Sequence, residues 1–283
     1  RADGARFSLR ICGFPNMKRR SMEDEMCWLD FVAQHAPRLA QRPIANQCGE
    51  LVTTINTPER EWLCCLFVWI EGSELRGATK PEQLHKIGRN AAALHNIARQ
   101  FPFPDDTSDF RSDYRYDQVL MRSHRGWIEK HRDAIGAENV TLLDRAIDYA
   151  ITQMDRRGST PDNYGVIHAD LHLGNVLVQD GEVAIMDFEQ VGRGHYLYDL
   201  TVMWTELLNE PANFPQLWQS FVTGYGEVAE LPFSQTEELN PFIVAIQLNS
   251  LDCIYNADNP TVPVDYGPKL PFYYESIRQR VDV

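Results

Sequence analysis

Three oxygen-bearing side chains, Asp170, Asn175 and Asp187, lie around a pair of short apolar runs. A carboxylate can accept or orient the proton of an attacking hydroxyl group. Carboxylate and amide oxygens are also the ligands that Mg²⁺ prefers in proteins. Phosphoryl transfer needs this combination, because the protein mainly positions the reacting groups and neutralises phosphate charge. We therefore predict Asp170 as the catalytic base and Asn175 and Asp187 as Mg²⁺ ligands.

The two apolar runs lie between Asn175 and Asp187 and are joined through Asp180-Gly181, a strong signal for a two-residue hairpin turn. In the register that this turn sets, Asn175 faces the residue just before Asp187. An amide oxygen and a carboxylate therefore reach the same end of the hairpin. Asp170, in the preceding loop, can lie over that end.

Histidines in this region allow a second interpretation. His168, Asp170 and His172 are spaced two residues apart and His195 follows downstream, so that together they could ligate a metal ion in a hydrolase. That arrangement gives no role to Asn175 or Asp187. A third interpretation is a plain surface hairpin, since Asp and Asn are common in turns. We favour phosphoryl transfer, with His168 as a scaffold that holds the loop.

The segment from Gly165 to Glu189 resembles the aminoglycoside phosphotransferase and choline-kinase branch of the protein-kinase-like fold. Residues 168–175 fit the catalytic-loop pattern of kinases, H-R-D-L-x-x-x-N, except that Ala169 replaces the arginine. In this branch the loop often reads H-x-D-x-H-x-x-N, and the glycine of D-F-G is commonly replaced, as in Asp187-Phe188-Glu189. The sequence of this segment is especially similar to that of the bacterial group containing stress-response kinases and type II homoserine kinases. The resemblance also implies that Asp199 braces the catalytic loop.

The N-terminal part resembles the small lobe of that fold. Residues 7–12 resemble its third strand, with Arg10 in the place of the usual lysine. The resemblance implies that Glu25, on the following helix, pairs with Arg10 and that the pair positions nucleotide phosphates. It also implies a hinge at Val68 and Ile70, whose backbone groups would bind the adenine of ATP.

One part of the family pattern is not found in the sequence. The strands and glycine-rich loop that cover the phosphates should precede Phe7, but only six residues do, and they contain no G-x-G-x-x-G. We therefore expect the small lobe to be incomplete and the chain to be a fragment of a longer sequence.

The wider pattern of the chain predicts an α+β, two-lobed, protein-kinase-like fold. Alternating or apolar runs predict strands over 7–12, 50–55 and 62–70, and a helix that starts at Ser21 and stops near Pro37. Helical spacing dominates afterwards, over 81–100, 142–154, 198–208 and 241–254, with a loop over 101–116. We expect residues 1–71 to form a partial, strand-rich N-lobe and residues 72–283 a larger helical C-lobe.

Composition limits the partners. The formal net charge is −13, which disfavours nucleic acid and anionic membranes as partners, and no apolar stretch is long enough to span a membrane. The six cysteines have no C-x-x-C spacing and read as small buried hydrophobes in a reducing compartment, which favours the cytoplasm. The sequence does not define the oligomeric state.

The acceptor is the least defined part. Overall acidity and the mixture of aromatic and acidic side chains favour a cationic hydroxyl compound such as an amino alcohol, homoserine or an aminoglycoside. The candidate contacts are His172, Trp204, Glu206, Tyr225, Asp252, Tyr255 and Asn256. A protein Ser/Thr kinase of the stress-response type and a non-catalytic kinase-like binding module stay open as alternatives.

Overall fold

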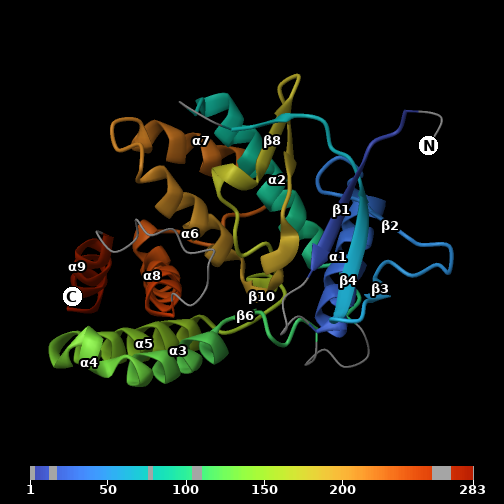
Figure 1. Cartoon of the computed structure of the whole chain (residues 1–283). Coiled ribbons are helices and arrows are strands. Elements are labelled where there is room, and N and C mark those ends of the chain that lie inside the picture. Colours follow the sequence, from blue (N-terminus) through green and yellow to red (C-terminus); the bar gives the residue numbers. More distant parts are fainter. Residues whose placement is uncertain (1–3, 13–17, 76–78, 104–109, 257–268, 283) are drawn as a thin grey trace.

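The computed structural model describes residues 4–12, 18–75, 79–103, 110–256 and 269–282. A strand-rich part and a larger helical part stand side by side, with a β-hairpin between them (Figure 1). The strand-rich part consists of β1 (Phe7–Cys12), α1 (Arg19–His35), β2 (Pro43–Ile44), β3 (Thr53–Asn56) and β4 (Glu61–Val68). The predicted boundary between residues 71 and 72 falls between β4 and the next strand and stays a prediction.

Strand β4 is the centre of the N-terminal sheet because its neighbours pair on both of its edges. The strand order is β1-β4-β2, with β3 also paired to β4, and every pairing is antiparallel. One face of this sheet packs on α1, whose buried stripe includes Met22, Met26, Leu29 and Val32 at helical spacing. The side chain of Arg10, on β1, therefore points toward α1 and contacts Glu25 there.

The larger part is mostly helical, as predicted. Its elements are β5 (Ser73–Glu74), α2 (Pro81–Ala98), β6 (Arg115–Tyr116), α3 (Gln118–Lys130), α4 (Arg132–Ile135), α5 (Ala137–Arg157), β7 (Tyr164–Ile167), β8 (Val176–Gln179), β9 (Glu182–Ile185), β10 (Gly192–His195), α6 (Tyr196–Leu207), α7 (Phe214–Gly226), α8 (Asn240–Tyr255) and α9 (Leu270–Val281). Short 3-10 helices span Leu173–Asn175, Phe188–Gln190 and Thr236–Leu239. The mixture of small sheets and long helices confirms the α+β class.

Two small sheets frame the catalytic loop. One has the order β6-β10-β7 and the other β5-β8-β9. The β8–β9 hairpin turns at Asp180 and Gly181, both with positive φ, of 51° and 79°, as a type I′ turn requires. Val176 pairs with Ile185 in the predicted register. Hydrogen bonding continues one step further, where Met186 N donates to the backbone oxygen of Asn175 at 2.9 Å.

Helices α2 and α7 approach unusually closely because each carries a glycine at the contact. A Cβ added to Gly88 would lie 2.0 Å from the carbonyl oxygen of Phe221, and one added to Gly224 would lie 1.9 Å from that of His85. No larger residue fits either position without moving a backbone. The close approach brings the buried polar side chains of both helices together beneath the catalytic loop.

Some predicted elements differ from the structure. The first helix begins at Arg19, two residues before the predicted start, so Ser21 lies inside the helix and not at its cap. The predicted strand over 50–55 is observed at Thr53–Asn56. Helices α3, α7 and α9 were not predicted from the sequence, and the predicted loop over 101–116 contains β6.

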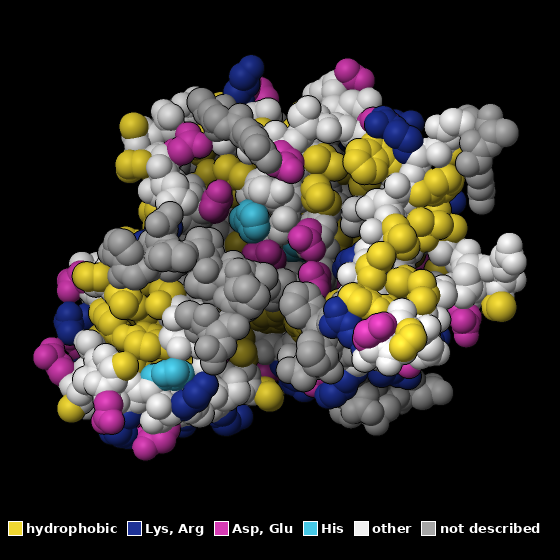
Figure 2. All heavy atoms as spheres, viewed as in Figure 1, with side chains coloured by type: hydrophobic (Ala, Val, Ile, Leu, Met, Phe, Trp, Pro, Cys, Tyr) yellow, Lys and Arg dark blue, Asp and Glu magenta, His cyan; other side chains and the backbone are white. Residues whose placement is uncertain are grey.

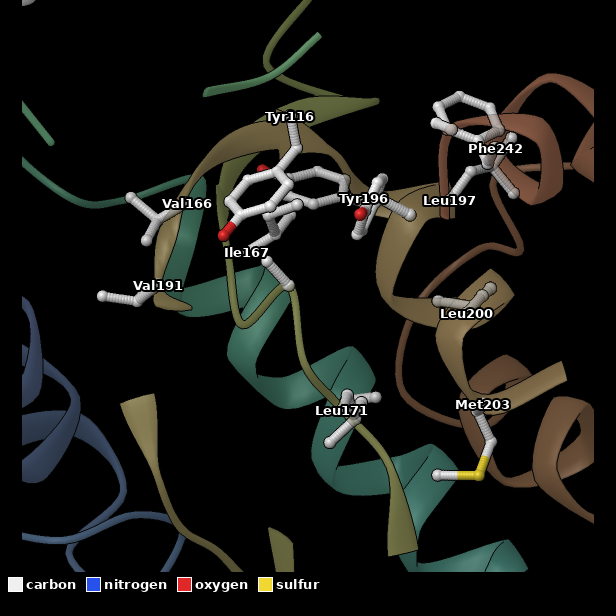
Figure 3. Packing of buried hydrophobic residues seen from close by; sticks show 14 of the residues in the cluster. Tyr116, Val166, Ile167, Leu171, Val191, Tyr196, Leu197, Leu200, Met203 and Phe242 are labelled. Atoms are coloured by element: carbon white, nitrogen blue, oxygen red, sulfur yellow. The ribbon is translucent and has the colours of Figure 1, made fainter. Parts of the chain in front are cut away.

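The main core lies directly behind the catalytic loop. Leu171, inside the loop itself, is fully buried, as are Leu197, Leu200 and Met203 of α6. Figure 3 shows Leu171 among side chains from β7 and α6. The buried side chain of Leu171, the residue after Asp170, therefore holds the loop onto the helical part. Among the described helices, none has the length and apolar character needed to cross a lipid bilayer.

Candidate functional site

The backbone of the catalytic loop is held by a buried carboxylate. Asp199, on α6, accepts hydrogen bonds from the backbone N–H groups of His168 at 2.9 Å and Ala169 at 2.7 Å. Ala169 has a positive φ of 67°, a conformation that costs an alanine free energy and needs support from its surroundings. The two N–H contacts supply that support, so the geometry fits the bracing role predicted for Asp199.

A second buried side chain, His95 of α2, fixes Asp199 in turn. Its Nε2 lies 3.0 Å from Asp199 Oδ2, and its Nδ1 lies 2.9 Å from the hydroxyl of Tyr225. A carboxylate only accepts, so Nε2 carries the proton and Nδ1 accepts from the tyrosine. Burial lowers the pKa of His95, which keeps this neutral form. Sequence analysis assigned no role to His95, although a histidine on the apolar face of a helix is a signal for a buried polar contact.

His168 links the loop to the hairpin, in keeping with the predicted scaffold role. Its Nε2 lies 3.0 Å from the carbonyl oxygen of Met186, and its Nδ1 accepts from Asp170 N at 3.2 Å. Its ring packs on Phe188, with 4.5 Å between ring centroids. Because both ring nitrogens are occupied and the residue is buried, His168 is not available as a proton carrier or a metal ligand.

Asp170 and Asn175 are joined by direct hydrogen bonds. The side-chain amide of Asn175 donates to the backbone oxygen of Asp170 at 2.9 Å and to its Oδ2 at 3.1 Å. Burial alone would raise the pKa of Asp170, but hydrogen bonding and charge from His172, His168 and Asn175 bring it below its ordinary value. Asp170 is therefore ionised at neutral pH and can accept a hydrogen bond from a hydroxyl group.

Asn175 and Asp187 offer oxygens to a cation. Since the amide hydrogens of Asn175 both point to Asp170, its Oδ1 faces the other way. Asp187 is exposed, has a φ of 61° and accepts no hydrogen bond from the described residues. Within the part of the chain that the structure describes, no group of three or more His, Cys, Asp or Glu could hold a metal ion alone. An amide oxygen and a carboxylate are ligands that suit Mg²⁺, which takes its other ligands from phosphate and water.

His172 lies among acidic side chains on the open side of the loop. Its Nε2 is 3.6 Å from Asp170 Oδ2, and its Nδ1 accepts from Gly174 N at 3.0 Å. The pKa of His172 is raised, first by Asp170 and further by the charges of Glu206 and Asp187. Figure 2 shows histidine and acidic side chains gathered near the middle of this face, between the two parts of the molecule. The site is therefore strongly electronegative.

Arg10 and Glu25 form the predicted ion pair. Two nitrogens of the guanidinium contact the two carboxylate oxygens, at 2.8 and 2.9 Å. The side chain of Glu25 is 1% exposed and that of Arg10 is 23% exposed. Burial opposes the charge on Arg10, but the contact with Glu25 prevails and raises its pKa. A fixed cation with one open side is suited to contact a nucleotide phosphate.

A cleft of about 410 Å³ lies between the strand-rich part and the hairpin. Ser8, Trp69, Ile70, Gly72, Ser73, Glu74, Leu177 and Met186 line it together with Gln41. At Val68 the predicted contact with the base can involve only the carbonyl group, because the N–H donates to Arg42 O at 3.0 Å, on the edge of β4 away from β1. That N–H is not free to bind a base. Ile70 lines the cleft and stays the hinge candidate.

The other predicted acceptor contacts are scattered. Trp204 of α6 packs edge-on against Phe214, with 5.4 Å between ring centroids. Asp252 of α8 lies 3.6 Å from Nδ1 of His124, and Tyr255 stacks on Trp127 of α3.

Two further acceptor candidates have contacts of their own. Asn256 accepts from Lys130 Nζ at 3.1 Å. Tyr225 is fully buried against His95, so the prediction that it contacts an acceptor is wrong.

The four-residue metal site of the hydrolase interpretation is not formed. His195 is fully buried and packs against Tyr164 and Phe242. Burial lowers its pKa to about 4. Both ring nitrogens of His168 are engaged, so Asp170 and His172 are the two members of that set with side-chain atoms available near each other.

Comparison with known proteins agrees with the site. A profile of the phosphotransferase enzyme family matches residues 1–234. An amicoumacin kinase of Bacillus subtilis (strain 168) is 21% identical over 155 residues, which are 52% of this chain and 43% of that protein. A homoserine kinase of Neisseria meningitidis serogroup B is 26% identical over 196 residues, 67% of this chain and 57% of that protein. The aligned parts span less than two thirds of these relatives.

Solved structures show the same fold. An amicoumacin kinase in complex with AMP-PNP, Ca²⁺ and Ami superposes with a TM-score of 0.77 and 19% identity, over 98% of this chain and 83% of that chain. A microcompartment-associated aminopropanol kinase gives 0.72 and 21% over 99% and 86%. The two-lobed kinase-like fold and the resemblance seen in the sequence are thus confirmed. Because the family profile covers most of the chain, the chain belongs to the phosphotransferase enzyme family.

Proposed function

We propose that the protein transfers the γ-phosphoryl group of ATP to a hydroxyl group of a small molecule. The observation that carries the proposal is the meeting of Asp170, Asn175 and Asp187 at one end of the β8–β9 hairpin, beside the cleft. Two oxygens are free for a cation, and an ionised carboxylate stands next to them. This is the arrangement that phosphoryl transfer requires.

Each residue has a separate task in this mechanism. Asp170 accepts a hydrogen bond from the attacking hydroxyl, orients its oxygen and takes its proton as the bond to phosphorus forms. Arg10, held by Glu25, positions the nucleotide phosphates. Asn175 Oδ1 and the Asp187 carboxylate would hold Mg²⁺, which neutralises phosphate charge when bound. Asp199 and His168 keep the loop in the geometry that these contacts need.

The acceptor that fits best is a cationic hydroxyl compound, such as an amino alcohol, homoserine or an aminoglycoside. Asp170, Asp187 and Glu206 all act on His172 and make this side of the loop electronegative. An ammonium group beside Glu206 would relieve that charge. The name of the aminopropanol kinase to which this chain is similar supports an amine-bearing acceptor.

The other predicted substrate contacts, Trp204, Asp252 and Tyr255, remain proposals for parts of the acceptor distant from the reacting hydroxyl. We also propose a cytoplasmic location, supported by cysteines without disulfide-type or metal-type spacing.

The test is a transfer assay with MgATP and a panel of acceptors: amino alcohols, homoserine, aminoglycosides and generic proteins. We expect phosphate transfer to a small amine-bearing acceptor, seen as a mass increase of the product. Transfer to the proteins alone would support a protein Ser/Thr kinase instead. If no acceptor is modified and MgATP does not raise the melting temperature, the chain is a binding module and the proposal is wrong.

A further inference from the structure

Arg111 is a fully buried arginine between the two parts of the molecule. It follows Phe110, which is also fully buried in an aromatic cluster with Phe101 and Phe103. Its φ is 46°, which a non-glycine residue adopts only when its surroundings enforce it. Burying a guanidinium is costly unless its donors find acceptors, and each side-chain nitrogen of Arg111 has one.

On one side, Arg111 holds helix α1. Its Nη1 donates to the backbone oxygen and to the hydroxyl of Ser21, both at 3.0 Å. Its backbone N–H donates to Asp24 Oδ2 at 2.9 Å. Nη1 also lies 3.8 Å from Oε2 of Glu25. The Glu25 carboxylate therefore lies between two guanidinium groups, of which the nearer belongs to Arg10.

On the other side, Arg111 holds the segment that follows Asp187. Its Nε donates to the backbone oxygen of Val191 at 2.7 Å, and its Nη2 donates to that of Glu189. These two carbonyls belong to the short helix Phe188–Gln190 and its C-terminal cap, and Asp187 is the N-terminal cap of the same helix. Tyr114 covers the flat face of the guanidinium, 3.7 Å from the ring centroid.

We propose that Arg111 is a positioning residue that joins the Asp187 segment to helix α1, so that the Arg10–Glu25 pair and Asp187 move as one unit. The planar fork of arginine is what allows this, because its nitrogens reach carbonyls on two separate elements at once. A lysine at this position has one side-chain nitrogen and cannot bond to α1 and to the Asp187 segment at the same time. The role in metal binding rests on the proposed function, whereas the link between the two elements does not.

The first experiment measures the link without any ligand. Hydrogen–deuterium exchange of the full chain should show about tenfold faster exchange over 186–191 and the first turns of α1 in Arg111→Lys. Helix α5 serves as the internal control and should keep its exchange rate. Arg125→Met, which removes a surface arginine paired to Asp144 and Asp148, is the matched control and should change neither segment.

A milder variant guards against failure to fold. Ser21→Ala removes one acceptor of the guanidinium and leaves a good helix former in α1. It should speed exchange over 186–191 in the same direction, but by less. Unchanged exchange over 186–191 in both Arg111→Lys and Ser21→Ala would overturn the link. Equally faster exchange in α5 would reduce Arg111 to a general stabilising residue and also overturn it.

The second experiment uses phosphate transfer and separates the link from the proposed function. Arg111→Lys should raise the Mg²⁺ concentration for half-maximal rate by about tenfold, while the KM of the acceptor stays constant. Combined with Glu25→Gln, it should lose less activity than the product of the two single losses. Multiplicative losses with an unchanged Mg²⁺ requirement would refute the coupling and leave the phosphotransferase proposal standing. Loss of the proposed function would instead appear as no transfer by the unmodified chain.

Discussion

The two sides of the catalytic loop are built differently. The phosphate side consists of Arg10, Glu25, Asp170, Asn175 and Asp187. Most of its members are held by direct hydrogen bonds or ion pairs, such as the two-point contact of Arg10 with Glu25 at 2.8 and 2.9 Å. Its geometry is therefore fixed before any ligand binds, as preorganised charge stabilisation requires.

The acceptor side consists of His172, Trp204, Glu206, Asp252 and Tyr255. Only His172 has a close contact with the loop carboxylate, and that separation is 3.6 Å. The others lie on α6 and α8, and Asp252 and Tyr255 contact α3 instead of the loop. The difference teaches that the groups proposed for phosphate chemistry are held by direct contacts with one another, whereas the groups proposed for acceptor choice are distributed over separate helices.

The largest expected effect is on the phosphate side. Asp170→Asn should lower kcat by about 10²–10⁴-fold, because the amide cannot take the hydroxyl proton. Binding of MgATP, followed by the rise in melting temperature, should survive. Asp180→Asn in the same hairpin is the matched control, since Asn also suits its positive φ of 51° and should leave kcat unchanged. Near-normal kcat in Asp170→Asn would remove Asp170 from the chemistry.

The next effect concerns the close packing of α2 on α7, which lies away from the phosphate side but supports the loop through His95 and Tyr225. Gly88→Ala forces a Cβ to within 2.0 Å of the Phe221 carbonyl. It should lower the free energy of unfolding by about 1–3 kcal/mol, as overpacked sites do. Gly126→Ala in α3, where an added Cβ meets nothing, should raise it by about 0.5–1 kcal/mol. Thermal and urea unfolding measure both, and equal effects would show that α2 and α7 can separate freely.

A smaller effect tests the acceptor side. Glu206→Gln should raise the KM of an amine-bearing acceptor by about 3–10-fold, since the proposed ion pair between the Glu206 carboxylate and the ammonium group of the acceptor is lost. The KM of ATP should stay constant, because Glu206 has no contact with the phosphate side. Steady-state kinetics with both substrates varied gives the two values. A rise in the KM of ATP instead would erase the distinction between the two sides.

The smallest effect concerns His172, the residue of the acceptor side that contacts Asp170 of the phosphate side. Its pKa, followed by NMR, should exceed 6.5 and fall more in Asp170→Asn than in Glu206→Gln. Because this pKa is raised by folding, the stability from the pair is complete below 6.5 and is lost as the pH rises through the folded-state value. The melting temperature of the unmodified chain should therefore exceed that of His172→Asn most near pH 6 and least near pH 8. A constant difference would show that the pair is not ionised.

The sequence predicts the site best where the contacts are local. The Asp-Gly turn fixes the hairpin register, and the register brings Asn175 next to the residue before Asp187. The Arg10–Glu25 pair was predicted from the family resemblance, that is, from knowledge of the family's fold and not from a local pattern in the chain.

Residues joined across long stretches of chain were missed or misplaced. Arg111 contacts α1 and Val191 across 80 or more residues, in a segment whose composition reads as a loop. The N–H of Val68 has a partner, Arg42, that no pattern in β4 reveals. The start of α1 moved to Arg19 for a related reason, since packing of the helix outweighed the cap signal at Ser21.

The alanine at position 169 bears on how activity is controlled. In many protein kinases the activation loop is ordered only after phosphorylation creates a new contact with an arginine. Here the arginine position of the H-R-D pattern carries Ala169, whose N–H is bonded to Asp199, and His95 fixes Asp199 from behind. The geometry of this loop is therefore held by contacts that form when the chain folds.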